Sequence, residues 1–453
     1  MKLYIITDLG FGDCGKGTTV DFLTRQEKKT LIVRYNGGPQ AAHNVVTSTG
    51  QHHCFSQFGS GSLVPGTSTY LSAHMLVNPI QLLNEAEHLS TLGVDKPLSR
   101  MNVDENCLVI TPFQQAANRI KEAIYGDKLS GSCGKGIWET QSDFEKFGDK
   151  VLFVRDLNNI PVALSKLLFI QKTKKLELSN LAKKSILKDK EIEYEVDLLD
   201  NPDAPGLCMQ HYRKFMNSVN IVPNNFLQQA LGDYPQIIFE GAQGVLLDVN
   251  YGFHPYKTWT DITPHHAEDI LISANVSLAD VHYLGIIRSY QTRHGPGPFV
   301  TEDNTLKLPE LHNDDNRWQK SFRVGYFDAV ATKYAIDVAG TMTSLSMTHL
   351  DYLNRMPHLF CDRYIYTGND VELLQNYFTL DGNRIITGIK ILPTDTPDLE
   401  KQRMSAILFD CKPNLVQFFD NFVDTAELVL NTKVSIVSNG PAEIDKKFAK
   451  QLV

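Results

Sequence analysis

Residues 2–24 read KLYIITDLGFGDCGKGTTVDFLT, and this stretch decides the fold class. The apolar run at 2–7 predicts a β-strand, the glycine-rich segment after it predicts a tight turn, and residues 18–29 predict a helix. A second β-prone run, TLIVRY, occupies residues 30–35. The order strand, glycine loop, helix, strand is typical of a parallel sheet. The sequence therefore predicts an α/β protein.

The rest of the chain continues this pattern without an obvious linker or repeat. Further strand-like runs occupy residues 151–154, 236–241, 281–290 and 434–438. Residues 164–195 are rich in Lys, Leu and Glu and predict a solvated helical segment, whereas residues 301–318 predict a loop. We expect a single domain over residues 1–453, centred on a large parallel sheet, with helical or loop insertions at about 80–130 and about 160–230.

The overall charge and the cysteines argue against several classes of protein. The formal net charge of the 453 residues is −8, whereas proteins that coat nucleic acid carry a strong basic excess. No apolar stretch approaches the roughly 20 residues that span a bilayer, and the first apolar run is too short for a signal peptide. The seven cysteines are scattered and never spaced as CxxC, which argues against a disulfide framework or a zinc site. We expect a cytoplasmic protein that binds neither nucleic acid nor a membrane.

The segment Gly10–Thr18 (GFGDCGKGT) predicts a phosphate-binding loop, because successive backbone N–H groups of such a turn surround phosphate oxygens at a helix N-terminus. Lys16 would place a point charge near the terminal phosphates. A phosphate loop usually has Ser or Thr after this lysine to hold magnesium, but here Gly17 follows and Asp13 lies inside the loop. A carboxylate in a phosphate cradle repels phosphate unless it binds a metal or transfers a proton. Asp13 is thus a magnesium ligand, a general base, or both.

This loop is the first of six ordered blocks that resemble the adenylosuccinate synthetase family. Residues 34–46 (RYNGGPQAAHNVV) are similar to its second block, and residues 239–248 (FEGAQGVLLD) are nearly identical to its FEGAQGTLLD block. Residues 285–302 (GIIRSYQTRHGPGPFVTE) resemble the segment that ends GPFPTE in the family. THLD at 348–351 and SNGP at 438–441 stand where the family has TKLD and STGP. Six blocks in the same order cover almost the whole chain, which chance does not explain.

The resemblance implies a ligase that acts on a purine nucleoside monophosphate. Asp13 would remove the N1 proton of a 6-oxopurine, so that O6 attacks the γ-phosphate of GTP, and would help bind Mg²⁺ together with Ala42, where the family has glycine. His43 would act as an acid or hydrogen-bond donor toward the leaving phosphate, a task that suits imidazole near neutral pH. The residues implied to contact GTP are Gly12, Gly15, Lys16, Gly17, His349, Asp351, Ser438, Gly440 and Pro441. The residues implied to contact the monophosphate are Gln40, Ser132, Cys133, Gln243 and Thr258.

Asp351 bears on the choice of phosphate donor. The matching aspartate of the family pairs with the N1–H and 2-amino groups of guanine, and adenine does not offer this pair of donors. Ser438, Gly440 and Pro441 would complete the base pocket. His349 stands where the family has a lysine along the guanine ring. The resemblance therefore implies GTP as the donor.

The segment that would bind the amine departs most from the family. The family has a TTGRxRR run whose arginines hold the carboxylates of aspartate in bidentate pairs. Residues 316–324 read NRWQKSFRV, so that Lys320 replaces one of these arginines and Phe322 the other. The cations left to bind L-aspartate are Arg317, Lys320 and Arg323.

Three hypotheses follow. The leading one is an enzyme that phosphorylates O6 of an IMP-like nucleotide with GTP and then joins L-aspartate at C6, giving adenylosuccinate, GDP and phosphate, with Mg²⁺ as cofactor and a homodimer as the assembly. The second keeps this chemistry with another purine nucleotide, such as a 2-aminopurine nucleotide, with another amine or with ATP. The third is a catalytically silent nucleotide sensor; the intact Asp13, Lys16 and His43 argue against it, and the altered amine segment argues for it.

Overall fold

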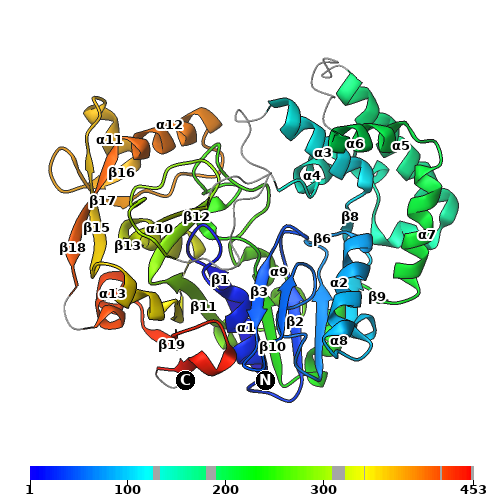
Figure 1. Ribbon diagram of the computed structural model, residues 1–453, viewed down its shortest axis with the longest axis horizontal. Helices are drawn as coiled ribbons and strands as arrows, with labels where there is room; N and C mark the ends of the chain where they lie inside the picture. The colour runs from blue at the N-terminus through cyan, green and yellow to red at the C-terminus, as the bar shows by residue number, and fades with distance from the viewer. Residues whose placement is uncertain (126–132, 180–189, 309–321, 341, 419–420, 450–453) are drawn as a thin grey trace.

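The computed structural model describes residues 1–125, 133–179, 190–308, 322–340, 342–418 and 421–449 (Figure 1). The main sheet of this part of the chain has ten strands in the order β20-β19-β14-β11-β1-β10-β2-β5-β7-β9. Strand β1 (Lys2–Asp8) lies between β10 (Gln236–Glu240) and β11 (His282–Arg288) and pairs with both in parallel. The remaining pairs are also parallel, apart from β19 with β20. The predicted α/β class with a large parallel sheet is confirmed.

Most of the predicted strands are present. The other strands of the main sheet are β2 (Thr30–Arg34), β5 (Thr67–Leu71), β7 (Met101–Asp104), β9 (Asn220–Val222), β14 (Ser344–Thr348), β19 (Val434–Ser438) and β20 (Lys446–Phe448). The run predicted as one strand at 281–290 is divided at Ser289, whose N–H bonds to the Thr348 carbonyl oxygen at 3.1 Å. Strand β11 ends there, and the chain enters a second sheet.

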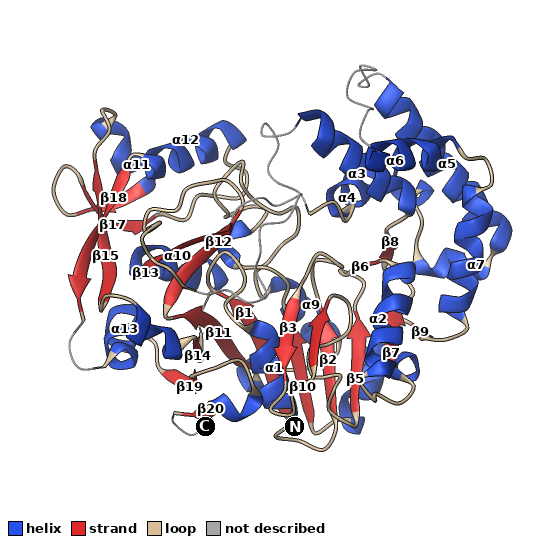
Figure 2. Ribbon diagram, viewed as in Figure 1, coloured by secondary structure: helices blue, strands red, loops and turns tan. Residues whose placement is uncertain are grey.

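The second sheet lies beside the main sheet and was not predicted (Figure 2). Its strands are β12 (Tyr290–His294), β13 (Phe322–Asp328), β15 (Leu359–Tyr366), β16 (Phe378–Leu380), β17 (Ile385–Ile389) and β18 (Cys411–Gln417). Two short ladders pair β3 (His43–Val46) with β4 (His52–Phe55) and β6 (Leu76–Val77) with β8 (Leu108–Val109).

Helices gather at the opposite end of the main sheet (Figure 1). They are α2 (Pro79–Thr91), α3 (Pro112–Tyr125), α4 (Ile137–Phe147), α5 (Ile160–Ser179), α6 (Lys190–Asp200) and α7 (Ala204–Met216), with α8 (Phe226–Ala230) below them. The helical segment predicted at 164–195 falls within α5 and α6, and its residues 180–189 lie outside the described part.

The strand predicted at 151–154 is wrong. Phe153 forms an isolated bridge to Leu108, and a 3-10 helix, η4 (Val154–Asn158), begins at the end of the run. Leu152 and Val154 are instead buried in the cluster that the helices share. A short apolar run indicates burial, but its period alone does not distinguish a strand from a connection between helices.

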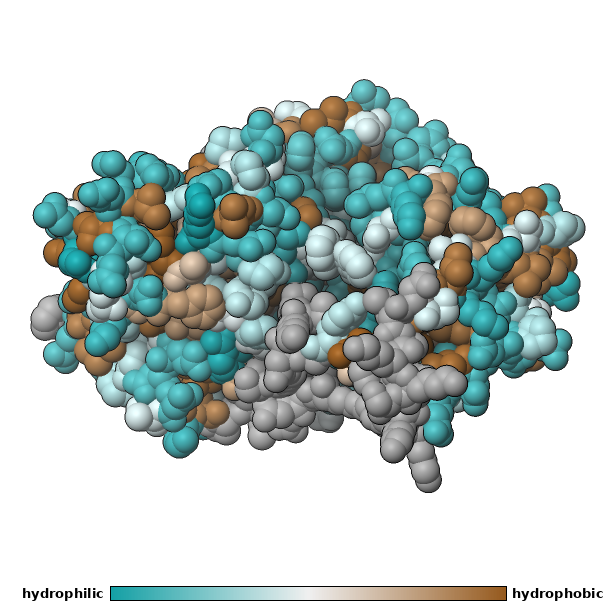
Figure 3. Space-filling model, turned by 90° about the horizontal axis from the view of Figure 1, so that it is seen from above, coloured by the Kyte–Doolittle hydropathy of each residue, from teal (hydrophilic) through white to brown (hydrophobic). Residues whose placement is uncertain are grey.

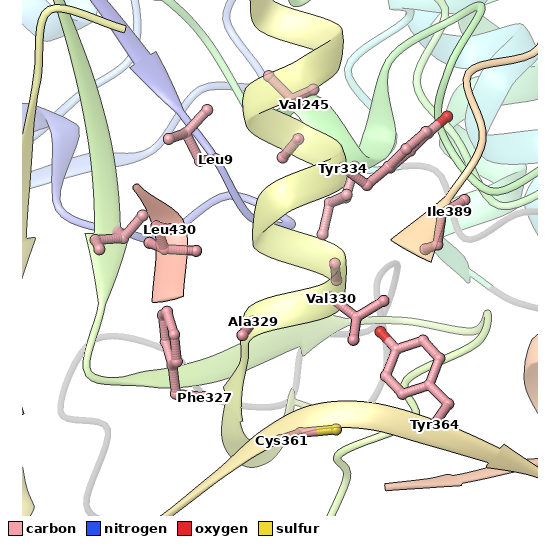
Figure 4. Close-up of a cluster of buried hydrophobic side chains, with 14 of the residues drawn as sticks. Leu9, Val245, Phe327, Ala329, Val330, Tyr334, Cys361, Tyr364, Ile389 and Leu430 are labelled. Atoms are coloured by element: carbon pink, nitrogen blue, oxygen red, sulfur yellow. The ribbon is translucent and has the colours of Figure 1, made fainter. Parts of the chain in front are cut away.

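The largest hydrophobic cluster joins the two sheets around helix α10 (Ala329–Ala339), which stands at its centre (Figure 4). Leu9 and Val245, from the loops after β1 and β10, pack on one side of α10, and Tyr364 of β15 packs near its first turn. The helices that complete this region and the flank of the main sheet are α9 (His265–Ser273), α11 (Leu374–Tyr377), α12 (Asp398–Phe409) and α13 (Phe422–Leu430). This packing fixes the loops after β1 and β10 against a rigid support.

The face seen from above carries mainly hydrophilic residues with scattered hydrophobic ones (Figure 3). Among the helices of the described residues, none is both long and apolar enough to span a bilayer.

Candidate functional site

A cavity of about 800 Å³ lies at the carboxyl ends of the main-sheet strands. Its lining comes from the loops that follow β1, β2 and β10 and from the ends of β11, β14 and β19. Open parallel sheets bind their ligands at this edge, where loops from neighbouring strands converge. The cavity brings together residues that are hundreds of positions apart in the sequence.

The glycine loop after β1 forms one wall of the cavity. Gly12 and Gly15 have φ angles of 96° and 95°, in the left-handed region that glycine adopts without strain, and Asp13 has a φ of 60°. Gly15 also precedes helix α1 (Lys16–Thr24), which ends earlier than the predicted helix at 18–29. A Cβ at Gly244 would lie 2.3 Å from both the Gly10 oxygen and the Gly12 nitrogen. The loop is therefore in backbone contact with the segment after β10.

The loop is anchored from outside and from inside. From outside, Arg288 Nη1 donates to the Asp13 carbonyl oxygen at 3.1 Å, and Thr348 Oγ1 donates to the Cys14 carbonyl oxygen at 2.7 Å. From inside, Lys16 Nζ lies 2.8 Å from Asp8 Oδ2, with both side chains buried. Lys16 and Gly17 line the cavity at the start of α1, where the first N–H groups of a helix have no intrahelical acceptor.

Asp13 faces the cavity and is paired with a histidine that the sequence analysis did not assign. His294 Nε2 lies 3.3 Å from Asp13 Oδ2. Burial raises the pKa of Asp13, but the hydrogen bond and charge of His294, with Lys16 and Arg288, outweigh burial, so that its pKa lies below the ordinary value. Asp13 is therefore ionised at neutral pH, the state in which a carboxylate accepts a proton or binds a metal.

His43 is held by a buried carboxylate. Its Nδ1 lies 2.6 Å from Glu240 Oε1, and Glu240 also accepts from the backbone N–H of Ser60 at 2.9 Å and from the Ser60 hydroxyl. Burial raises the pKa of Glu240, but the charge of Arg34, with the bonds from His43 and Ser60, lowers it to about 2. The ionised Glu240 fixes the proton on Nδ1 of His43 and leaves Nε2 as the ring nitrogen not bound to Glu240.

Four of the five residues predicted to bind the monophosphate line the cavity. Gln40 Nε2 donates to Gln243 Oε1 at 3.3 Å, which joins the loops after β2 and β10. Cys133 and Thr258 also line the cavity. Ser132 lies outside the described residues.

The residues predicted to bind the nucleotide base line the same cavity. Asp351 lies in the first turn of η8 (Leu350–Arg355), two residues after His349, which has a left-handed φ of 59°. Within the described residues, Asp351 Oδ1 is buried and has no hydrogen-bond partner. Burial is the main cause of the raised pKa of Asp351. Ser438, Gly440 and Pro441 lie in the lining of the same cavity. A buried acceptor without a donor fits a ligand that brings N–H groups.

Of the three cations predicted to bind the amine, Arg323 is described and Arg317 and Lys320 lie outside the described residues. Arg323 Nη1 donates to Glu302 Oε2 at 2.9 Å, and its Nη2 donates to the carbonyl oxygens of Gly295 and Gly297 at 2.7 and 3.0 Å. The Nη groups of Arg323 are thus bonded to Glu302 and to the 295–297 turn, and Arg323 is not among the residues that line the cavity.

The predicted magnesium ligands are the carboxylate of Asp13 and the backbone at Ala42, and both residues line the cavity. Within the described residues there is no group of three or more His, Cys, Asp or Glu side chains placed to hold a metal. Mg²⁺ is commonly held by one or two carboxylates together with substrate phosphates and water. The arrangement fits Mg²⁺ carried in with a nucleotide, and the ion would neutralise charge on the phosphates.

The sequence analysis missed three polar residues that touch the predicted ones. Glu240 lies in the block FEGAQG and His294 in the block that contains TRHGPGPF. Their position in blocks that resemble the family was the sequence feature that could have marked them as site residues. Asp8 has no such signal, because an aspartate at the end of a strand is common at any turn. Each of the three becomes visible only when the fold places it beside Lys16, Asp13 or His43.

Comparisons with known proteins agree with one family. A family model described as adenylosuccinate synthetase matches residues 5–446. The adenylosuccinate synthetase of Pseudoalteromonas atlantica is 29% identical over 446 residues, covering 97% of this chain and 96% of that protein. The adenylosuccinate synthetase of Bdellovibrio bacteriovorus is 27% identical over 459 residues, covering 100% of this chain and 99% of that protein.

Two solved structures share the fold. The fully ligated adenylosuccinate synthetase of Plasmodium falciparum has a TM-score of 0.75 at 18% identity, covering 99% of this chain and 100% of that chain. The cyanophage S-2L succinoaminodeoxyadenylate synthetase, bound to dGMP and to dATP as an energy donor, has a TM-score of 0.58 at 15% identity, covering 99% of this chain and 96% of that chain.

Proposed function

The chain belongs to the adenylosuccinate synthetase family of GTP-dependent ligases, and from this premise we propose that it joins L-aspartate to IMP with GTP as the phosphate donor. The observation that carries the proposal is one cavity lined by an ionised Asp13, by His43 on its buried Glu240, and by Asp351 with a buried, unpartnered oxygen. These groups serve three tasks: removing a proton, stabilising a phosphoryl group and selecting guanine.

The first step is proton removal and phosphoryl transfer. The Asp13 carboxylate takes the N1 proton of the 6-oxopurine, and the negative charge that this leaves on O6 makes O6 a nucleophile toward the γ-phosphorus of GTP. The O6–P bond forms as the bond to the β,γ-bridging oxygen breaks, and GDP leaves. The depressed pKa of Asp13 keeps the carboxylate ionised and ready at neutral pH. In the second step the amine of aspartate attacks C6, and the 6-phosphate leaves.

His43 stabilises the charge that moves between the phosphates. The anionic Glu240 holds the ring by Nδ1, which leaves Nε2 for the phosphoryl oxygens. Burial lowers the pKa of His43 despite the opposing effect of Glu240, and a phosphate beside Nε2 raises it again, because an opposite charge favours the imidazolium form. His43 therefore gains a proton where phosphate charge is present.

The amine would bind at the segment that departs most from the family pattern, residues 316–324. We assign the binding of aspartate to Arg317 and Lys320. Arg323 would anchor the segment that carries these two residues, because it bonds β13 to the 295–297 turn. A dicarboxylate requires two cationic partners, and lysine pairs less rigidly than arginine. We expect a higher KM for aspartate than two matched arginines would give.

The proposal is tested by the products. Purified protein is incubated with IMP, GMP and dGMP in turn, with GTP or ATP and with a mixture of amino acids, and the nucleotides are analysed by mass spectrometry. Adenylosuccinate and GDP from IMP, GTP and aspartate are the expected result. An aspartate adduct of dGMP, a preference for ATP, or an amine that outcompetes aspartate at equal concentration would overturn the corresponding assignment.

A further inference from the structure

Asp8, the last residue of β1, lies inside the phosphate-binding loop and has no role in the reaction described above. The residue is 1% exposed. Its Oδ1 accepts from the backbone N–H groups of Gly10 at 2.9 Å and Gly12 at 3.3 Å. Its Oδ2 accepts from the N–H of Cys14 at 3.0 Å and from Lys16 Nζ at 2.8 Å. Four donors of one loop therefore converge on a single carboxylate.

This arrangement changes which groups are available to a nucleotide. The N–H groups of Gly10, Gly12 and Cys14 point into the loop, toward Asp8, and not toward the cavity. Lys16 is a residue of the cavity lining, so the donors left for phosphate are the first N–H groups of α1 and the Lys16 ammonium group. Lys16 carries three N–H bonds, and Asp8 uses one of them.

We propose that Asp8 is a positioning residue for the phosphate donor: its carboxylate shapes the loop from within and holds the ammonium of Lys16 at the cavity wall. The inference rests on the proposed function in that it assumes a nucleoside triphosphate at this loop. A lysine side chain has several rotatable bonds, and a glycine-rich loop has few side chains of its own to fix its shape. Asp8 supplies both constraints before the nucleotide binds, so that less conformational freedom is lost on binding.

The charge of Asp8 by itself acts in the opposite direction, which makes the proposal testable. A carboxylate near a triphosphate repels it, and its removal would strengthen binding if charge were the whole effect. If Asp8 acts through Lys16, removing the Asp8 charge weakens binding while Lys16 is present. The same change strengthens binding once Lys16 is gone, because Asp8 is then an uncompensated anion beside the phosphates.

The experiment is a double-mutant cycle on nucleotide affinity, measured by titration calorimetry with GTP and with ATP in the presence of Mg²⁺. Asp8→Asn keeps the size of the side chain and one acceptor oxygen, and we expect it to weaken binding about tenfold, the scale of one charge-assisted hydrogen bond. In the Lys16→Met background we expect Asp8→Asn to strengthen binding. Affinity for IMP, measured alone, should change by less than about twofold in Asp8→Asn.

Asp21→Asn is the matched control. Asp21 is a buried carboxylate on α1 that pairs with Arg25, whereas Lys16 pairs with Asp8. We expect nucleotide affinity within about twofold of wild type for this variant, since it changes a buried charge elsewhere on the same helix. Thermal unfolding of each variant reports its stability. If Asp8→Asn does not fold, Asp8→Ser repeats the cycle with a smaller acceptor.

Two results would overturn the role of Asp8: tighter nucleotide binding by Asp8→Asn in the wild-type background, or the same change in affinity with and without Lys16. The second result would mean that Asp8 has a structural role independent of the lysine. A failure of the proposed function looks different. Wild-type protein that binds ATP and not GTP would retire the guanine assignment and leave the cycle intact, because both nucleotides carry the same triphosphate.

Discussion

Replacing Glu240 by Gln tests the claim that a buried carboxylate prepares His43 for catalysis. The amide has almost the same shape, but it carries no charge and has one acceptor oxygen where the carboxylate has two. In the structure Glu240 accepts from His43 Nδ1 at 2.6 Å, from the Ser60 N–H at 2.9 Å and from the Ser60 hydroxyl. One of these donors must face the amide NH₂ group of Gln.

The size of the effect follows from the bond that is lost. A hydrogen bond to a charged group contributes about 1.5–3 kcal/mol net, which corresponds to about 10- to 150-fold in rate if it is lost in the transition state. We expect kcat of Glu240→Gln to fall by this factor and the KM for GTP to change little. The assay is the rate of adenylosuccinate formation by liquid chromatography under saturating IMP, GTP and aspartate.

Two controls separate catalysis from folding. Ser60→Ala removes a hydroxyl that bonds to the same carboxylate and keeps the charge beside His43. It should retain kcat to within about threefold, because the charged bond between Glu240 and His43 is kept. In a His43→Ala background, Glu240→Gln should have no further effect on kcat. Wild-type kcat in Glu240→Gln, or an equal loss with and without His43, would refute the coupling.

Four further predictions concern other residues. Asp13→Asn should lower kcat by at least about a hundredfold with little change in melting temperature, because a positioned base is lost; near-normal turnover would end the proposed mechanism. Asp351→Asn should reduce the preference for GTP over ATP in kcat/KM, since an amide meets the two guanine donors with one acceptor; an unchanged ratio would remove Asp351 from the base site. Arg323→Ala should raise the KM for aspartate and leave that for IMP nearly unchanged, because the substitution releases the segment that carries the amine-binding cations; a KM for aspartate equal to that of wild type would exclude this role. Burial lowers the pKa of Lys446 from 10.5 to about 8, so between these values the unfolded chain binds more protons. The wild-type free energy of unfolding should therefore rise relative to that of Lys446→Met as pH increases from 8 toward 10.5, measured by urea denaturation; a constant difference would contradict it.

The sequence predicts the centre of the fold well, because its signals there are local. The apolar run at 2–7, the glycine turn and the run at 30–35 form a strand–loop–strand unit within a few tens of residues, and β1 and β2 are both present. The matched blocks also lie around one cavity, with Asp13 and Asp351 both in its lining. The order of the blocks along the chain carried this information.

What could not be predicted depends on contacts that are distant in the sequence. Glu240 and His43 are separated by 197 positions, and no local pattern relates them. The second sheet was missed because its strands pair with partners that are distant in the sequence, and because the division at Ser289 depends on a hydrogen bond to Thr348. Arg323 was predicted to face the amine from its place in a motif, but its donors are directed to Glu302 and the 295–297 turn.

The central claim is that O6 of the purine takes the γ-phosphoryl group of GTP and leaves C6 as phosphate. IMP labelled with ¹⁸O at the 6-position tests it directly: the enzyme is incubated with the labelled IMP, GTP and aspartate, and the released phosphate is analysed by mass spectrometry. If Asp13 makes O6 attack the γ-phosphorus, the label moves from IMP into inorganic phosphate in step with adenylosuccinate formation. Unlabelled phosphate accompanying adenylosuccinate would mean that the C6–O6 bond breaks without a 6-phosphoryl intermediate, and would contradict the account.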